Sequence, residues 1–310
     1  MRPVRKGSLS LGLGVLVALA LAPLASPTLP GQSGLIAFVS YPVGTRLGNG
    51  IAVMRADGSR MRMLTAGRHD RSPAWSPKGR WVVFERGARL YVVGADGRGL
   101  RRLTPRTLGY HGPAWSPDGH SIAFDRGGSI FLMTANGKAE HLIYRARNES
   151  ASDPAWSRDG THLAFDLRRT GPGLDEGSSI VVVDRRGGGL RYVTKGSDLS
   201  QAALDTGEDA DDYEPNWSPD GMRIAFTRTV WFCGGCDQEE VFIANADGTG
   251  VRWLTTDSSY ASWDPSWSPD GNSFAARTNA GGISIFDASG HLLLMIPGYA
   301  ARPAWQPLGR

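Results

Sequence analysis

The sequence predicts an all-β protein, a six-bladed β-propeller closed by pairing of its C-terminal strand with its N-terminal strands. Three observations lead to this fold class. A tryptophan-centred phrase occurs six times, short apolar runs and tight turns follow most copies, and the two ends of the chain carry complementary parts of one repeat. The 41 glycines and 19 prolines among 310 residues suit a chain with many turns.

The repeated phrase reads Pro-x-Trp-Ser-Pro-Asp-Gly in its most regular copies, and it decays in the last one. Its tryptophans are Trp75, Trp115, Trp156, Trp217, Trp267 and Trp305. Successive tryptophans are 40, 41, 61, 50 and 38 residues apart. A period near 40 with strand and turn chemistry in each unit is typical of propeller blades. Because each tryptophan recurs at the same repeat position, we expect these side chains to pack between blades.

The copy around Trp115 shows how each blade is built. We expect an innermost strand at 113–116, a second strand at 121–125, a third at 129–134 and an outer strand at 139–143. Pro-Asp-Gly makes the first turn and Ala-Asn-Gly the last, since proline fixes φ and glycine accepts positive φ. The central strands are apolar on both faces, as expected for a blade that is covered on both sides.

The two ends of the chain complete each other. Residues 35–38 read as a second strand without a first, and residues 302–310 read as a first strand without a second. Together they predict one blade that closes the ring and hides its edges. We therefore predict a propeller over residues 34–310, preceded by a linker at 27–33.

Residues 1–26 read as an export signal. The basic residues Arg2, Arg5 and Lys6 precede an uncharged apolar run at 9–24. An uncleaved N-terminal anchor is the alternative, although the run is short for a membrane-spanning helix. We expect an exported protein, periplasmic or extracellular, that touches a membrane only through this leader.

Charge argues against a nucleic-acid partner. The chain has 34 basic and 30 acidic residues, and three of its cations lie in the leader. The remainder is therefore nearly neutral, whereas a nucleic-acid binder needs clustered cations to neutralise phosphates.

The only two cysteines, Cys233 and Cys236, form Cys-Gly-Gly-Cys. In an exported protein this spacing favours a small disulfide that closes a loop. A thioredoxin-type redox centre is the alternative, but it needs a strand-to-helix junction that this region lacks.

The phrase xPxWSPDGxxIAF, followed by an Ala-Asp-Gly or Ala-Asn-Gly turn, resembles the WD40-like (PD40) repeat of the TolB family over essentially everything after residue 33. The resemblance implies a β-propeller and an envelope partner. TolB proteins carry an α/β domain before the propeller, whereas we expect only a leader and a linker here. Such blades also occur in scaffolds and beside serine-peptidase domains, so the resemblance predicts fold better than function.

Insertions collect on one predicted face of the ring. They occur at 41–50, 168–178, 195–213 and 229–238, all in loops from second to third strand or between blades. The other loops are uniformly tight turns. Insertions on one face of a repeat protein favour a binding surface. Trp231, beside the cysteine pair, is the candidate surface anchor because interfaces favour tryptophan.

The residue before each motif proline should lie near the channel axis. These residues are Ser72, Gly112, Asp153, Glu214, Asp264 and Arg302. Three successive carboxylates, Asp153, Glu214 and Asp264, could hold Ca²⁺ or another divalent cation, and His111 could join a softer site. The alternative is that these carboxylates cap turns or pair with Arg302 and Arg71.

These observations favour an exported, non-catalytic and monomeric propeller that binds a protein or another envelope component through its loop-rich face. No Gly-x-Ser-x-Gly or His-Glu-x-x-His motif is present. The alternative is a metal-assisted lyase or hydrolase, lactonase-like, whose His111, Asp153, Glu214 and Asp264 meet at the channel mouth.

Overall fold

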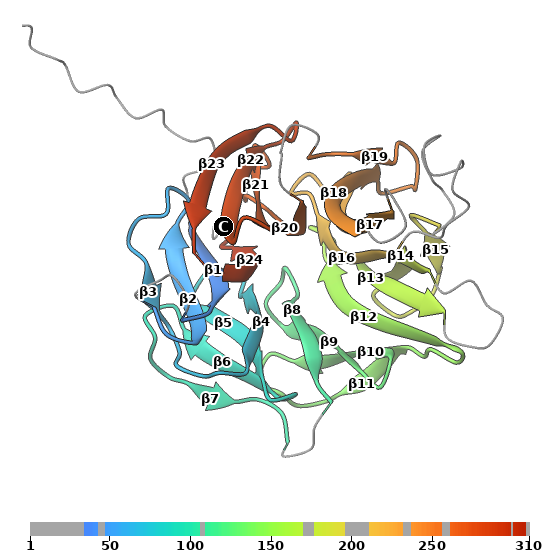
Figure 1. The fold of residues 1–310 in the computed structure, drawn as a ribbon. Helices are drawn as coiled ribbons and strands as arrows, with labels where there is room; N and C mark the ends of the chain where they lie inside the picture. The colour runs from blue at the N-terminus through green and yellow to red at the C-terminus, as the bar shows by residue number, and fades with distance from the viewer. Residues whose placement is uncertain are drawn as a thin grey trace, which may run out of the picture.

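The structure is a computed structural model that describes residues 34–42, 47–105, 109–169, 177–195, 211–231, 237–255, 261–298 and 300–307. These residues form six four-stranded antiparallel sheets arranged as the blades of a propeller (Figure 1). The predicted fold class is confirmed. No helix in the described part of the chain has the length and apolar character needed to cross a membrane.

The blades follow one another around the ring, and each is given from its innermost to its outermost strand. Blade 1 consists of β24 (Ala300–Trp305), β1 (Leu35–Ser40), β2 (Gly50–Arg55) and β3 (Arg62–Met63). Blade 2 consists of β4 (Asp70–Trp75), β5 (Trp81–Arg86), β6 (Leu90–Gly94) and β7 (Arg101–Arg102). Blade 3 consists of β8 (His111–Trp115), β9 (Ser121–Arg126), β10 (Ser129–Thr134) and β11 (His141–Tyr144).

The second half of the ring repeats this order. Blade 4 consists of β12 (Glu149–Trp156), β13 (His162–Arg169), β14 (Ser178–Asp184) and β15 (Arg191–Tyr192). Blade 5 consists of β16 (Asp212–Trp217), β17 (Arg223–Trp231), β18 (Asp237–Asn245) and β19 (Arg252–Trp253). Blade 6 consists of β20 (Ser262–Trp267), β21 (Ser273–Thr278), β22 (Gly282–Asp287) and β23 (Leu292–Pro297).

The closure predicted from the two ends of the chain is present in blade 1. Strand β24 pairs with β1 in antiparallel register, with Ile36 opposite Trp305 and Ala37 opposite Ala304. The innermost strand of the first blade therefore comes from the end of the chain, and no gap is left between blades 6 and 1 (Figure 1).

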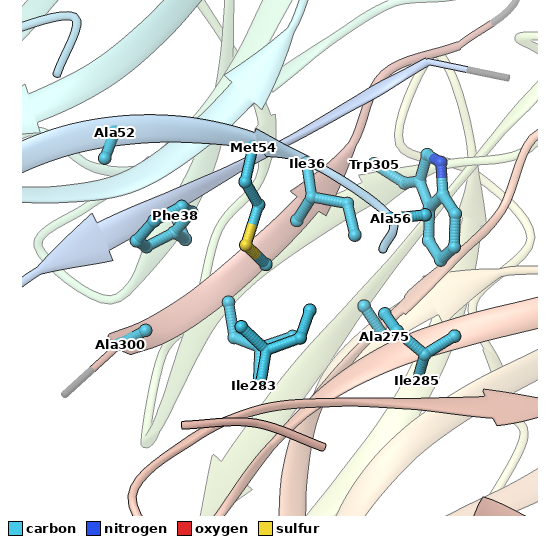
Figure 2. Packing of buried hydrophobic residues seen from close by; sticks show 11 residues of the cluster. Ile36, Phe38, Ala52, Met54, Ala56, Ala275, Ile283, Ile285, Ala300 and Trp305 are labelled. Carbon is cyan, nitrogen blue, oxygen red and sulfur yellow. The ribbon is translucent and has the colours of Figure 1, made fainter. Parts of the chain in front are cut away.

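The core consists of apolar clusters between neighbouring blades. Figure 2 shows the cluster between blades 1 and 6, where Ile36, Met54 and Trp305 face Ile283 and Ile285. The predicted role of the motif tryptophans is confirmed in the same way. The indole of Trp75 donates to the carbonyl of Ala304 at 3.0 Å, and Trp156 donates to Ala114 at 3.2 Å.

The blade analysed in detail differs from prediction mainly at its inner and outer strands. Strand β8 begins at His111 rather than at residue 113. Strand β11 begins at His141 rather than at residue 139. Ala139 has φ of 50°, in the left-handed region, so the turn after β10 continues through it. The predicted propeller boundaries at residues 34 and 310 stay a prediction, as do the leader and linker, because residues 1–33 lie outside the described part.

Candidate functional site

The residues that precede the motif prolines form a ring around the channel, which we call the axial ring. Its members are Ser72, Gly112, Asp153, Glu214, Asp264 and Arg302. All six have φ between 47° and 59°, although only one is glycine. The register of the inner strand shifts at this point in every blade, for example between Arg71 and Ala74. A bulge of this kind re-aims a side chain, and repeated backbone strain points to a functional or tightly determined position.

Arg302 joins the axial ring into one hydrogen-bonded cluster. Its Nη1 donates to Ser72 Oγ at 2.9 Å and to Asp153 Oδ1 at 3.0 Å. Its Nη2 lies 2.9 Å from Glu214 Oε1, and its Nε lies 3.9 Å from Asp264 Oδ1. The backbone N–H of Arg302 also donates to Asp264 Oδ2 at 3.0 Å. The guanidinium fork thus contacts residues from four other blades.

The axial cluster contains three carboxylates and one guanidinium. Burial, and then the nearby charge of Asp264, raise the pKa of Glu214 well above its usual range, while Arg302 opposes the shift. The carboxylate of Asp153, followed by Glu214 and Asp264, raises the pKa of the Arg302 guanidinium further. The floor of the channel is therefore acidic overall and internally paired.

These contacts bear on the predicted divalent-cation site. A metal ion bound by Asp153, Glu214 and Asp264 would need the three carboxylates to face one point without a competing cation. In the structure the Arg302 side chain contacts all three. Within the described ranges, no group of three or more His, Cys, Asp and Glu side chains could hold a metal ion. The donor set fits a guanidinium better than a metal, and the cation site stays a prediction.

A cavity of about 490 Å³ lies on one side of the axial ring. The ring is its floor, and its walls are lined by the Pro-x-Trp segments of five inner strands and by Pro265 and Ser266 of the sixth. Its rim is formed by residues of the tight turns, among them Pro77, Lys78, Pro117 and Arg158. Volume and lining are typical of a binding site with apolar walls and a few convergent polar groups. The cavity faces the tight turns, whereas the sequence favoured the loop-rich face.

A second polar group lies on the other side of the axial ring, toward the loop-rich face. His111 Nδ1 lies 3.1 Å from Glu85 Oε2. Burial, and then the charge of Asp153, raise the pKa of Asp125 to about 7 and that of Asp166 well above its ordinary range. His111 is thus paired with Glu85 next to Asp125, and it does not lie in the cavity lining with the axial carboxylates.

Sequence reasoning missed Glu85, Asp125 and Asp166. The signal that could have found them is their common position, directly after the phenylalanine of the second strand in three successive blades. In the paired strands, Asp125 lies opposite His111 of β8, and Asp166 lies opposite Ser152 of β12. Ser152 donates a hydrogen bond to Asp166 at 2.7 Å.

The remaining predicted site residues lie at the edge of what the structure describes. Trp231 ends strand β17, where its backbone pairs with Asp237, but its side chain is outside the description. Cys233 and Cys236 lie outside the described residues, so the disulfide stays a prediction. Most of the insertions at 41–50, 168–178, 195–213 and 229–238 also lie there, and the loop-rich binding face stays a prediction with them.

Comparisons with known proteins agree on the architecture. The crystal structure of TolB from Acinetobacter baumannii matches with a TM-score of 0.67 at 22% identity, over 89% of this chain and 67% of that one. Putative TolB from Agrobacterium tumefaciens matches with a TM-score of 0.62 at 19% identity, over 85% and 88%. This chain therefore shares the six-bladed β-propeller fold of these TolB structures.

The sequence comparisons cover less of this chain. A segment of 47 residues is 49% identical to the Tol-Pal system protein TolB of Zymomonas mobilis subsp. mobilis, which is 14% of this chain and 10% of that relative. This chain therefore matches far less than two thirds of the relative's length. No family model matches. An oligogalacturonate lyase solved in complex with manganese also shares the fold, with a TM-score of 0.53 at 15% identity.

Proposed function

We propose that this TolB-like propeller is an exported, non-catalytic binding protein that receives a segment of a cell-envelope protein in its central cavity. The observation that carries the proposal is that the charged groups on the cavity floor are buried and paired with one another. Glu214 and Asp264 are largely buried and are bonded to Arg302. A general acid or base must instead reach its substrate and exchange a proton with it.

The lining of the cavity indicates the chemistry of the segment. Proline, alanine and tryptophan from the inner strands present apolar surface, which suits apolar or proline-containing side chains of an extended peptide. Three carboxylates against one guanidinium make the floor acidic, which suits a lysine, an arginine or another N–H-rich group at the deepest point. The likeness to TolB proteins supports an envelope partner.

Site-specific photo-crosslinking in cells tests this function and its location. A photo-reactive amino acid replaces Lys78 or Arg158 at the cavity rim, Tyr41 on the loop-rich face, or Arg252 on the outer strand of blade 5. We expect one envelope protein to be captured from both rim positions and not from Arg252. Enlarging a wall residue with Ala114→Trp should fill the cavity and abolish that capture.

The outcomes of this experiment show whether a partner binds and on which surface it binds. Capture from Tyr41 alone would move the binding surface to the loop-rich face that the sequence favoured. Capture from the rim that survives Ala114→Trp in a folded protein would mean that the partner lies over the cavity rather than in it. Failure of every position to capture a protein would contradict the proposed function.

The metal-assisted lyase or hydrolase is the second candidate. The observation that favours it is the group around His111, Glu85 and Asp125, because a carboxyl with a pKa near 7 can act as an acid or a base at neutral pH. Its test is turnover of acidic oligosaccharides or lactones with added Mn²⁺ or Ca²⁺. Activity that is lost in Asp125→Asn and His111→Gln would establish it.

A further inference from the structure

A surface on blades 1 and 2, away from the axial ring, combines exposed arginines with exposed large apolar side chains. We call it the basic patch. Its members are Arg60, Met61, Arg62, Arg80, Trp81, Arg98, Leu100, Arg101 and Arg102. Strands β3 and β7, which carry several of them, lie on the outer rim of neighbouring blades (Figure 1).

Contacts within the patch make it one continuous surface. The Arg62 side chain of blade 1 donates to the carbonyl of Ala95 in blade 2 at 2.5 Å. The backbones of Arg80 and Arg98 both hydrogen-bond to the turn that contains Ala95, at 2.8 Å and 2.7 Å. The ring of Trp81 lies over Gly99, where an added Cβ would be 3.2 Å from the ring. The patch is therefore continuous across the two blades.

The patch concentrates positive charge on a nearly neutral protein. Six arginines are accompanied by two exposed aspartates, Asp57 and Asp96, in the adjacent turns. The tight turns of blades 5 and 6 instead carry Asp220, Asp247, Asp270 and Asp287, of which Asp220 is paired with Arg223. A cluster of cations of this kind attracts anionic surfaces and orients the molecule toward them.

The apolar members indicate which anionic surface. Met61, Trp81 and Leu100 are exposed by 37%, 39% and 46%. A soluble polyanion needs only the cations, and large apolar side chains left in water beside it gain nothing. A lipid surface uses both, because arginines pair with phosphate groups while tryptophan, leucine and methionine enter the boundary between headgroups and acyl chains.

We propose that the basic patch docks this propeller on an anionic lipid surface, with the arginines on lipid phosphates and with Met61, Trp81 and Leu100 inserted between headgroups. The patch is separate from the central cavity, so this docking does not depend on the proposed partner. Bound in this way, the propeller lies on its blade 1 and blade 2 side and leaves blades 4 and 5 in solution.

Vesicle co-sedimentation of the full chain tests the proposal. The probes are vesicles of phosphatidylglycerol and phosphatidylcholine, vesicles of phosphatidylcholine alone, and heparin as a soluble polyanion. The variant is Arg98→Glu with Arg102→Glu, and the matched control is Arg145→Glu with Arg147→Glu, two exposed arginines outside the patch. All proteins share residues 1–33, so any contribution from that segment cancels in the comparison.

We expect the patch variant to partition at least about thirtyfold more weakly onto anionic vesicles, and the control to stay within about twofold of the unchanged protein. Trp81→Ala with Leu100→Ala should reduce the binding that remains at high salt, whereas Met222→Ala in blade 5 should not. Equal loss in the patch variant and the control would overturn the proposal. Binding to heparin without binding to anionic vesicles would also overturn it, in favour of a soluble polyanion.

Discussion

The guanidinium of Arg302 lies 3.0 Å from the carboxylate of Asp153, although the two residues are 149 positions apart in the sequence. Arg302 belongs to the inner strand of blade 1 and Asp153 to that of blade 4, on the opposite side of a ring of six. Other contacts between blades mostly join neighbouring blades, apart from that of Arg302 with Glu214 in blade 5. The hydrogen bond between Arg302 and Asp153 instead spans the channel axis, and it depends on the strand that closes the ring.

Replacing Arg302 with methionine should destabilise the protein by about 2–3 kcal/mol, because the carboxylates of Asp153, Glu214 and Asp264 lose their shared cation. The cost is below that of a fully buried pair, since the Arg302 side chain is 36% exposed toward the cavity. Urea unfolding at pH 7 measures it. Adding Glu214→Gln should recover part of the loss, and an Arg302→Met variant as stable as the unchanged protein would refute the cross-channel role.

Two buried carboxyls should make stability fall as the pH rises. Burial raises the pKa of Asp125 to about 7 and that of Glu240 to about 7, so the folded state binds these protons more tightly than the unfolded chain does. The stabilisation from this tighter proton binding is fully present below the ordinary carboxyl pKa, and it is lost as the pH rises toward 7. Between pH 5 and pH 8, we expect a decrease on the order of 2 kcal/mol for each residue.

Unfolding measured across this pH range in Asp125→Asn and Glu240→Gln checks the assignment, because each change should flatten the profile. Asp159→Asn is the matched control. Hydrogen bonds from Ser157 and from the backbone of Thr161 lower the pKa of Asp159 to about 2, so its titration lies outside the range. An unchanged slope in both test variants would show that neither carboxyl holds a proton in the folded state.

Much of this molecule could be predicted from repetition alone. Recurrence of Trp75 and its five equivalents predicted the blades, and the position before each motif proline predicted the axial ring. The pairing of Arg302 with the three carboxylates was only the alternative to a metal site, because repeats define a position but not which of the side chains there will pair. The sequence favoured a binding surface on the loops and did not predict the cavity, because a pocket lined by six inner strands depends on how the blades are arranged in space.

Sequence reasoning also did not predict two hydrogen-bonded Thr–Asp–Arg links between neighbouring blades. Thr65 donates to Asp70, which is held in turn by Arg86, and Thr194, Asp212 and Arg228 repeat this arrangement three blades later. The members of each link are separated by loops of different length, and within the described ranges the arrangement recurs in two blades. Such partial recurrence cannot be distinguished from chance in a single sequence.

The ion pair of Arg228 and Asp212 in blade 5 should be among the strongest single contributions to stability. Arg228 Nε and Nη2 donate to the two oxygens of Asp212 at 2.6 Å and 2.7 Å, and the two side chains are 3% and 0% exposed. Arg228→Met leaves Asp212 buried without its cation and should cost about 3–5 kcal/mol. The partly exposed pair of Arg168 and Asp211, at 3.6 Å, provides the comparison.

Arg168→Met should cost less than about 1 kcal/mol, because an ion pair in contact with water gains little and is screened by salt. Guanidinium chloride unfolding of both variants measures the difference. The prediction fails if the two substitutions cost the same. It also fails if Arg228→Met with Asp212→Leu is no more stable than Arg228→Met alone, since that pair of changes removes the stranded charge.

Removal of residues 299–310 should abolish the closed ring. Strand β24 supplies the innermost strand of blade 1, and its Trp305 and Ala300 complete the cluster between blades 1 and 6. Without it, the edge of β1 and the buried faces of Ile36 and Ile283 are open to water and to other chains. Size-exclusion chromatography and thermal unfolding should show an oligomeric product without a cooperative transition.

The control for this truncation is removal of residues 308–310 alone, which should leave both measurements unchanged. A synthetic peptide of residues 299–310 should restore a cooperative transition to the shortened chain, because it supplies the missing strand. The same peptide with Arg302→Met should do so more weakly, since it lacks the cation that the axial carboxylates share. A shortened chain that stays monomeric and melts at the original temperature would show that the ring does not depend on its last strand.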